Sequence, residues 1–118
     1  MRDPRDDIQT DERPWGRFTR YAHDESCTVK VIEVVAGGIL SLQRHAQRDE
    51  LWVALDPGLT FEIGDTEVEA AVGEPYLVPR GTVHRVSAGD QAGRFLEVAF
   101  GTFDEDDIER LEDAYGRA

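Results

Sequence analysis

Hydrophobic residues recur along the chain in short runs that are typical of β-strands. Residues 28–35 (TVKVIEVV) are rich in β-branched side chains, and Leu40 and Leu42 alternate with polar neighbours in the run that follows. Residues 51–55 (LWVAL) form a continuous apolar run, which predicts a strand buried on both faces. Similar short runs continue to residue 100. The pattern therefore predicts a chain built mainly from strands.

Turn signals separate these runs at intervals of about ten residues. They stand at residues 37–38 (GG), 56–58 (DPG) and 64–65 (GD), and the last pair lies between two alternating runs, as in a hairpin. Segments this short leave no room for the helices that connect parallel strands. The sequence therefore favours an all-β sandwich or barrel over a parallel α/β sheet.

Only the end of the chain predicts a helix. Asp104 can cap the first turn, where acidic residues also interact favourably with the helix dipole. Ile108, Leu111 and Tyr115 follow at helical spacing and would share one face, and Gly116 would end the helix. We therefore expect a short C-terminal helix that packs against the barrel.

The length of the chain, 118 residues, fits one domain with one core. Residues 1–12 are mostly charged, so we expect a flexible acidic N-terminal arm followed by a single domain over residues 13–118. The N-terminus lacks the apolar stretch of a secretory signal, and no run is long enough to span a membrane. The single cysteine, Cys27, excludes an internal disulfide and favours a reducing, cytoplasmic location.

The net charge of −12 disfavours nucleic acids and anionic membranes as partners. At first it also argues against an anionic small molecule. Much of the negative charge, however, falls at the two ends of the chain, whereas the middle of the chain carries Lys30, Arg44, Arg48, Arg80 and Arg85. A binding site in this central part can therefore be locally basic.

Two of the three histidines lie near other polar side chains at strand spacing. Gln43 and His45 are two residues apart, so on a strand they share one face, and Glu50 can return beside them on the next strand. His84 stands at the exit of a tight turn that begins at Pro79. These four polar residues are the candidates for a functional site.

They stand in two segments that resemble the two motifs of the cupin family. Residues 37–50 (GGILSLQRHAQRDE) resemble the first motif, and residues 73–84 (GEPYLVPRGTVH) match the spacing of the second. The resemblance implies a jelly-roll barrel, or double-stranded β-helix, in which Gln43, His45, Glu50 and His84 bind a divalent metal ion. Two imidazoles and two oxygen donors suit zinc, which we expect, and also Mn, Fe, Co or Ni.

A longer series of matches resembles one branch of this family. Residues 12–16 (ERPWG) open the series, and residues 106–108 (DDI) and 115–117 (YGR) close it. The series looks like the C-terminal cupin domain of type II mannose-6-phosphate isomerases, which is often fused to a mannose-1-phosphate guanylyltransferase. The resemblance covers residues 12–117 and implies the conversion of mannose 6-phosphate to fructose 6-phosphate.

The same resemblance implies roles for charged residues near the motifs. The reaction needs an electrophile for the ene-diolate, a base that moves a proton between C2 and C1, and cations that hold the phosphate. Arg48, Arg85 and Glu50 are the catalytic candidates. Lys30, Arg48 and Arg85 are the candidates for substrate binding, because the family carries basic residues there. Cupins commonly pair through strand edges, so we also expect a homodimer.

Three positions depart from the family pattern. Ala46, Gln47 and Leu51 stand where histidine is typical, and one of those histidines could have supplied the base. Two alternatives to an isomerase therefore stay open. One is a catalytically altered metallo-cupin that binds a small sugar or acid, and the other is an oxygenase-type cupin.

Overall fold

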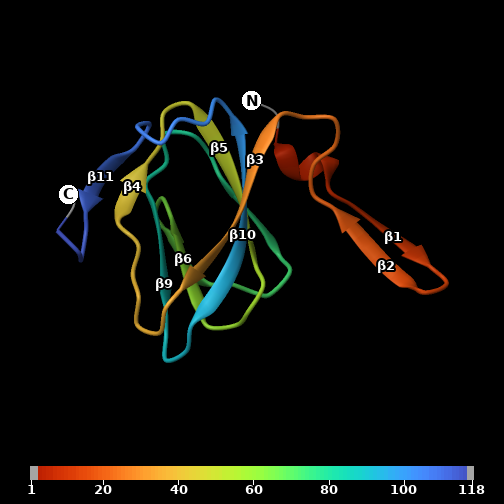
Figure 1. Cartoon of the computed structure of the whole chain (residues 1–118), viewed down its shortest axis with the longest axis horizontal. Helices are drawn as coiled ribbons and strands as arrows, with labels where there is room; N and C mark the ends of the chain where they lie inside the picture. Colours follow the sequence, from red (N-terminus) through yellow and green to blue (C-terminus); the bar gives the residue numbers. More distant parts are fainter. Residues whose placement is uncertain (1–2, 117–118) are drawn as a thin grey trace.

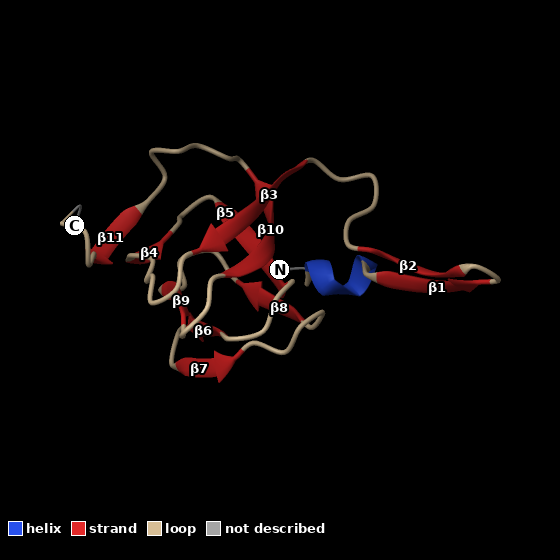
Figure 2. Cartoon of the chain, turned by 60° about the horizontal axis from the view of Figure 1, so that its bottom comes forward, coloured by secondary structure: helices blue, strands red, loops and turns tan. Residues whose placement is uncertain are grey.

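Two antiparallel sheets face each other in this computed structural model, which describes residues 3–116 (Figure 1, Figure 2). The first sheet contains, in order, β3 (Cys27–Val34), β10 (Gly93–Gly101), β5 (Arg48–Ala54) and β8 (Pro75–Val78). The second contains β11 (Glu109–Glu112), β4 (Leu42–Arg44), β9 (His84–Ala88), β6 (Leu59–Ile63) and β7 (Thr66–Glu69). This is the all-β architecture that the turn spacing predicts.

The core lies between the two sheets and is rich in aromatic side chains. Trp52 and Phe95 point inward from the first sheet, Phe61 and Val86 point inward from the second, and each is at most 1% exposed. Burial of each of these side chains stabilises the fold by roughly 1.5–3 kcal/mol. Strand β5 is buried at every position, which confirms the predicted doubly covered strand.

The N-terminal segment packs against part of the outer face of the first sheet. A 3-10 helix, η1 (Pro4–Asp7), leads into a hairpin of β1 (Gln9–Arg13) and β2 (Gly16–Arg20), which projects from the barrel (Figure 1). Residues that precede and follow the hairpin in the sequence pack against an apolar cluster on the outer face of the sheet. The packed residues are Ile8, Tyr21 and Ala22, and the cluster consists of Leu51, Val98 and Phe100.

The predicted boundary between arm and domain, after residue 12, falls inside β1. Residues 1 and 2 of the predicted arm, and residues 117 and 118 of the predicted domain, lie outside the described residues. The remainder of the arm carries η1 and most of β1, and its flexibility stays a prediction.

The turn between β6 and β7 falls where the glycine signal predicts it. Gly64 has a φ of +59°, a left-handed conformation that glycine adopts without strain. Its N–H donates to the carbonyl of Val83 at 2.8 Å, so the hairpin also holds the loop that precedes β9. The predicted hairpin is confirmed, and its turn is hydrogen-bonded to Val83, the residue that precedes His84.

The predicted C-terminal helix is wrong. Residues 109–112 form β11, which pairs with β4 and places Glu109 opposite Arg44, with the ion pair closing to 2.7 Å. This cross-strand pair favours the strand, whereas an isolated helix of that length is marginal in water. Leu111 and Tyr115 are 45% and 61% exposed, so the residues at helical spacing do not form a buried face. No helix within residues 3–116 is long and apolar enough to cross a membrane.

The edge strand β3 has an exposed apolar outer face and a free edge. Its outer face carries Val29 and Val31, each 57% exposed, and its free edge pairs with no strand within residues 3–116. Residues 9–20 of the hairpin carry three arginines against two carboxylates, whereas the chain as a whole is strongly acidic. We expect a homodimer in which the hairpin of one copy contacts β3 of the other.

Light scattering is expected to give twice the chain mass of 13.2 kDa. Val31→Lys should shift the mass toward that of the monomer, because burying an unpaired ammonium in an interface is costly. Val72→Lys is the matched control, since Val72 is similarly exposed, at 55%, but lies outside β3. A monomer mass for the unmodified protein would refute the prediction.

Candidate metal centre

Three side chains that could bind a metal ion meet at one end of the barrel. His45 follows β4, Glu50 lies on β5 and His84 begins β9. One ligand atom from each residue lies within 4.8 Å of the other two. All three residues are buried, with 4% or less of their surface exposed. The structure thus brings together three of the four predicted ligands, and we call them the His–Glu–His group.

The two sequence motifs contact each other through their backbones. Gly81 has a φ of +80° in the turn before β9, and its N–H donates to the carbonyl of His45. Any other residue would be strained in this conformation, so glycine allows the turn to approach the first motif. The tight turn therefore fixes His84 relative to His45.

Gln43, the fourth predicted ligand, lies directly opposite His84 in the β4–β9 pair. Residues opposite each other in an antiparallel pair share one face, so the amide lies beside the imidazole. The Gln43 Oε1 atom accepts a hydrogen bond from the Ser41 hydroxyl at 2.7 Å. An amide oxygen has two lone pairs, so this bond leaves one for an ion.

The hydrogen bonds of the two imidazoles prepare them to bind a metal. His84 Nδ1 donates to the carbonyl of Thr82 at 2.9 Å, and His45 Nδ1 donates to the carbonyl of Asp107 at 2.7 Å. A carbonyl can only accept, so Nδ1 carries a proton in each ring, and the neutral form of each ring would direct the Nε2 lone pair to the group. His84 Nε2 is buried without a hydrogen-bond partner, and burial lowers the pKa of this histidine. A buried, neutral and unpaired nitrogen fits a metal ligand.

Glu50 is held from several sides. Its Oε1 accepts a hydrogen bond from Trp52 Nε1 at 3.2 Å, and its Oε2 accepts one from Arg48 Nε at 3.1 Å. Burial alone would raise the pKa of Glu50, but the neighbouring imidazoles of His84 and His45 and the hydrogen bonds outweigh it. The pKa therefore lies below its usual value, and Glu50 is ionised.

A second buried carboxyl, Glu97 on β10, contacts Glu50 by a side-chain hydrogen bond. Burial and the Glu50 carboxylate raise the pKa of Glu97 to about 8, so this carboxyl is protonated at neutral pH. Glu97 lies outside the two sequence motifs. A signal was present, because an acidic residue interrupts the apolar run of residues 95–100 at an inward-facing position.

Two of the three predicted cations lie beside this group. Lys30 stands opposite Glu97 in the β3–β10 pair. Arg48 is only 7% exposed, and its Nη2 lies 3.2 Å from His45 Nε2. Both cations also lie over the Phe103 ring. Lys30 Nζ is 4.4 Å and Arg48 Cζ is 4.3 Å from the ring centroid. Two cations therefore lie at the inner end of the barrel, close to the His–Glu–His group.

The third predicted cation, Arg85, does not join them. It follows His84 on β9, so its side chain leaves the opposite face of the strand. Its Nε donates to the carbonyl of Leu40 at 2.9 Å, and its Nη1 lies 3.8 Å from a carboxylate oxygen of Glu112. These contacts favour a structural role in which Arg85 holds β11 to the barrel.

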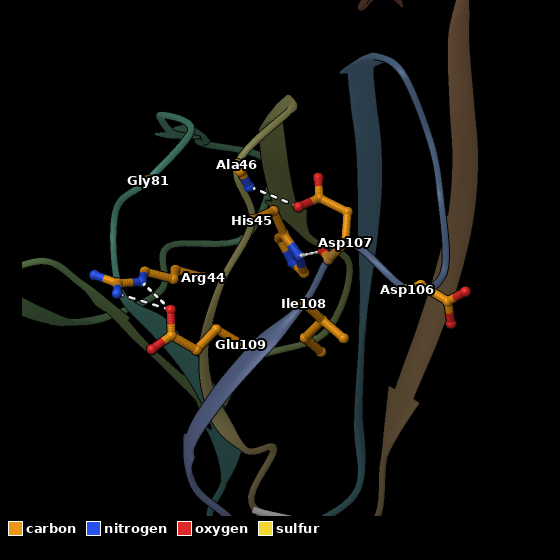
Figure 3. Close-up of a pocket in the computed structure, with 8 residues that line it drawn as sticks. All are labelled: Arg44, His45, Ala46, Gly81, Asp106, Asp107, Ile108 and Glu109. Atoms are coloured by element: carbon orange, nitrogen blue, oxygen red, sulfur yellow. Dashed lines mark hydrogen bonds and ion pairs between the residues drawn. The ribbon is translucent and has the colours of Figure 1, made fainter.

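A cavity of about 310 Å³ lies beside His45 (Figure 3). Its wall comes from the end of β4, the turn at Gly81 and the segment that leads into β11. Pockets of this volume suit small ligands. Because His45 belongs both to this wall and to the His–Glu–His group, the cavity adjoins the candidate metal centre.

Comparison with known proteins places the chain in a family. Residues 2–113 match the family model described as "Mannose-6-phosphate isomerase C-terminal". The "Xanthan biosynthesis protein XanB" of Xanthomonas campestris pv. campestris is 35% identical over 107 residues, which are 89% of this chain and 23% of that protein. The chain thus spans less than a quarter of the length of this relative.

Solved structures share the fold. A cupin 2 conserved barrel domain protein from Rhodopseudomonas palustris superposes with a TM-score of 0.60 and 25% identity, over 71% of this chain and 62% of that one. The dTDP-6-deoxy-D-glucose-3,5-epimerase RmlC from Legionella pneumophila superposes with a TM-score of 0.70 and 10% identity, over 88% and 69%. The predicted cupin barrel is confirmed, and the chain belongs to the family of mannose-6-phosphate isomerase C-terminal domains.

Proposed function

We propose that this domain is a metal-dependent aldose–ketose isomerase that converts mannose 6-phosphate to fructose 6-phosphate. The observation that carries the proposal is the buried His–Glu–His group, with a carboxyl pair and two cations around it, in a chain of this family. The lone cysteine is in keeping with action in the cytoplasm.

The His–Glu–His group, with Gln43, would hold the ion, which we expect to be zinc. A divalent ion there would polarise the sugar carbonyl and favour charge on the ene-diolate oxygens. Arg48 donates to Glu50 Oε2 and would keep that carboxylate oriented. The imidazole nitrogen has one lone pair, so Arg48 would have to release His45 Nε2 before an ion binds there.

The carboxyl pair of Glu50 and Glu97 would carry out the proton transfer. Isomerisation removes a proton from C2, returns one to C1 and moves the hydroxyl proton from O2 to O1, so the composition of the sugar does not change. A pair in which one carboxyl is ionised and the other protonated can accept one proton and deliver another. Glu97 thereby offers a second acid–base group beside the predicted Glu50.

Lys30 and Arg48 would bind the phosphate group of the substrate. Both lie at the same end of the barrel as the His–Glu–His group, and an arginine can bind two phosphate oxygens at once. In a chain with 25 acidic residues, these two cations would supply the local positive charge that binds a dianion.

A coupled assay that follows fructose 6-phosphate tests the function. The protein loaded with zinc is expected to turn over mannose 6-phosphate, and a chelator is expected to abolish the activity. Glucose 6-phosphate at the same concentration is the substrate control for the configuration at C2. A protein that binds metal and mannose 6-phosphate yet shows no turnover with Zn, Mn, Fe, Co or Ni would instead be a sugar-phosphate-binding cupin.

A further inference from the structure

The segment between β10 and β11 runs across the end of the barrel that holds the His–Glu–His group (Figure 1). We call residues 102–107 (TFDEDD) the strap. Four of its six residues are acidic. Its position matters, because a ligand that approaches the group from this end meets the strap first.

The strap binds both cations that the proposed function assigns to phosphate. The ring of Phe103 contacts Lys30 and Arg48 together, at 4.4 and 4.3 Å. Glu105 lies 3.8 Å from Lys30 Nζ, and the carbonyl of Asp104 accepts a hydrogen bond from Arg48 Nη1 at 3.2 Å. Each cation is thus held by an aromatic face and by an oxygen of the strap.

The far end of the strap is fastened to the first sequence motif. The Asp107 carboxylate accepts hydrogen bonds from the backbone N–H groups of Ala46 and Gln47, both at 2.9 Å. Figure 3 shows the bond from Ala46. The carbonyl of Asp107 accepts from His45 Nδ1. The residues of the His–Glu–His group are at most 4% exposed while these contacts are made.

We propose that the strap is an autoinhibitory lid, and that an anionic ligand opens it by taking Lys30 and Arg48 away from Phe103, Asp104 and Glu105. The ligand class, a phosphorylated sugar, rests on the proposed function, whereas the displacement rests on the contacts alone. A phosphate dianion offers both cations more charge than one carboxylate and one carbonyl. It also repels the four strap carboxylates within a Debye length, which favours the open state.

The contacts that close the strap are of a kind that a ligand can replace. The Lys30–Glu105 pair is exposed, with 37% and 81% of the side-chain surfaces accessible, and exposed pairs contribute little. The cavity of about 310 Å³ beside His45 is lined partly by Asp106 and Asp107, so the strap already borders open space. Opening would also break the hydrogen bonds from Ala46 and Gln47 to the Asp107 carboxylate.

Inorganic phosphate is the probe, with binding followed by calorimetry. Phe103→Ala is expected to bind phosphate roughly five- to thirtyfold more tightly than the unmodified protein, because it removes two competing cation–π contacts. Phe103→Leu keeps most of the apolar surface and should change the affinity in the same direction. The matched control is Phe18→Ala, which removes the Arg13–Phe18 contact on the distant hairpin and should leave the affinity unchanged.

Hydrogen exchange supplies a readout that does not depend on turnover. Saturating phosphate is expected to speed exchange of the Ala46 and Gln47 amides several-fold, because the opened strap withdraws the Asp107 carboxylate. Unchanged exchange, equal phosphate affinity in Phe103→Ala and Phe18→Ala, or no phosphate binding by any of these proteins would overturn the lid. If phosphate binding and amide exchange change as expected while isomerase activity is absent, the proposed function fails and the lid stands.

Discussion

Replacing His84 with alanine is expected to remove metal binding and to leave the barrel folded. His84 is 2% exposed, and its buried Nε2 has no hydrogen-bond partner within the described residues. An ion would satisfy this nitrogen, so its loss leaves a site with one imidazole. Residues that only orient ligands already cost 10–100-fold in metal affinity when mutated, so the loss of a ligand should exceed about 100-fold.

The measurement is zinc content after dialysis, together with a zinc titration and circular dichroism. The cavity left by the ring should lower the free energy of unfolding by about 2 kcal/mol, which a barrel of this size can tolerate. His84→Leu fills that space without a ligand atom and should lose zinc equally. His23→Ala is the control, because the His23 side chain is 56% exposed and pairs only with Asp24 among the described contacts. Stoichiometric zinc in His84→Ala would show that the ligand assignment is wrong.

The barrel could be predicted from sequence because its signals are local. Alternating valines, the continuous run around Trp52 and glycine turns such as Gly64 each depend on a few neighbouring residues. The C-terminal helix failed for the opposite reason. Ile108 and Leu111 have helical spacing, but the partner that decided the outcome, Arg44 on β4, lies 65 residues away from Glu109 along the chain.

The same distinction applies to the site. His45, Glu50 and His84 could be proposed from motif spacing, and the structure brings them together. Glu97 became a site candidate only when the register placed it between Trp52 and Lys30 on neighbouring strands. Conversely, Arg85 lies next to His84 in sequence yet leaves the other face of β9, because neighbouring side chains alternate along a strand.

The metal-free protein is expected to lose stability as pH rises from neutral to 8, and Glu97→Gln is expected to remove this loss. Between its ordinary pKa of 4.5 and its raised pKa of about 8, Glu97 is protonated in the native state and ionised in the unfolded chain. The native state then binds the additional proton, so the free energy of unfolding falls with pH, by up to about 1.4 kcal/mol per pH unit. The stabilisation is complete below pH 4.5 and lost above pH 8.

Urea titrations between pH 7.5 and 8 limit the contribution of His84, because that ring is neutral in the native state and largely neutral in the unfolded chain there. A chelator must be present, since a bound cation would favour the ionised form of Glu97. Glutamine keeps a donor toward Glu50 without a titrating proton, and Glu67→Gln on the exposed face of β7 is the control that should keep the slope. If the free energy of unfolding of Glu97→Gln falls with pH as steeply as that of the unmodified protein, Glu97 is ionised at neutral pH. The pair would then have no proton to deliver, and the acid half of the proposed proton transfer would have to come from another group.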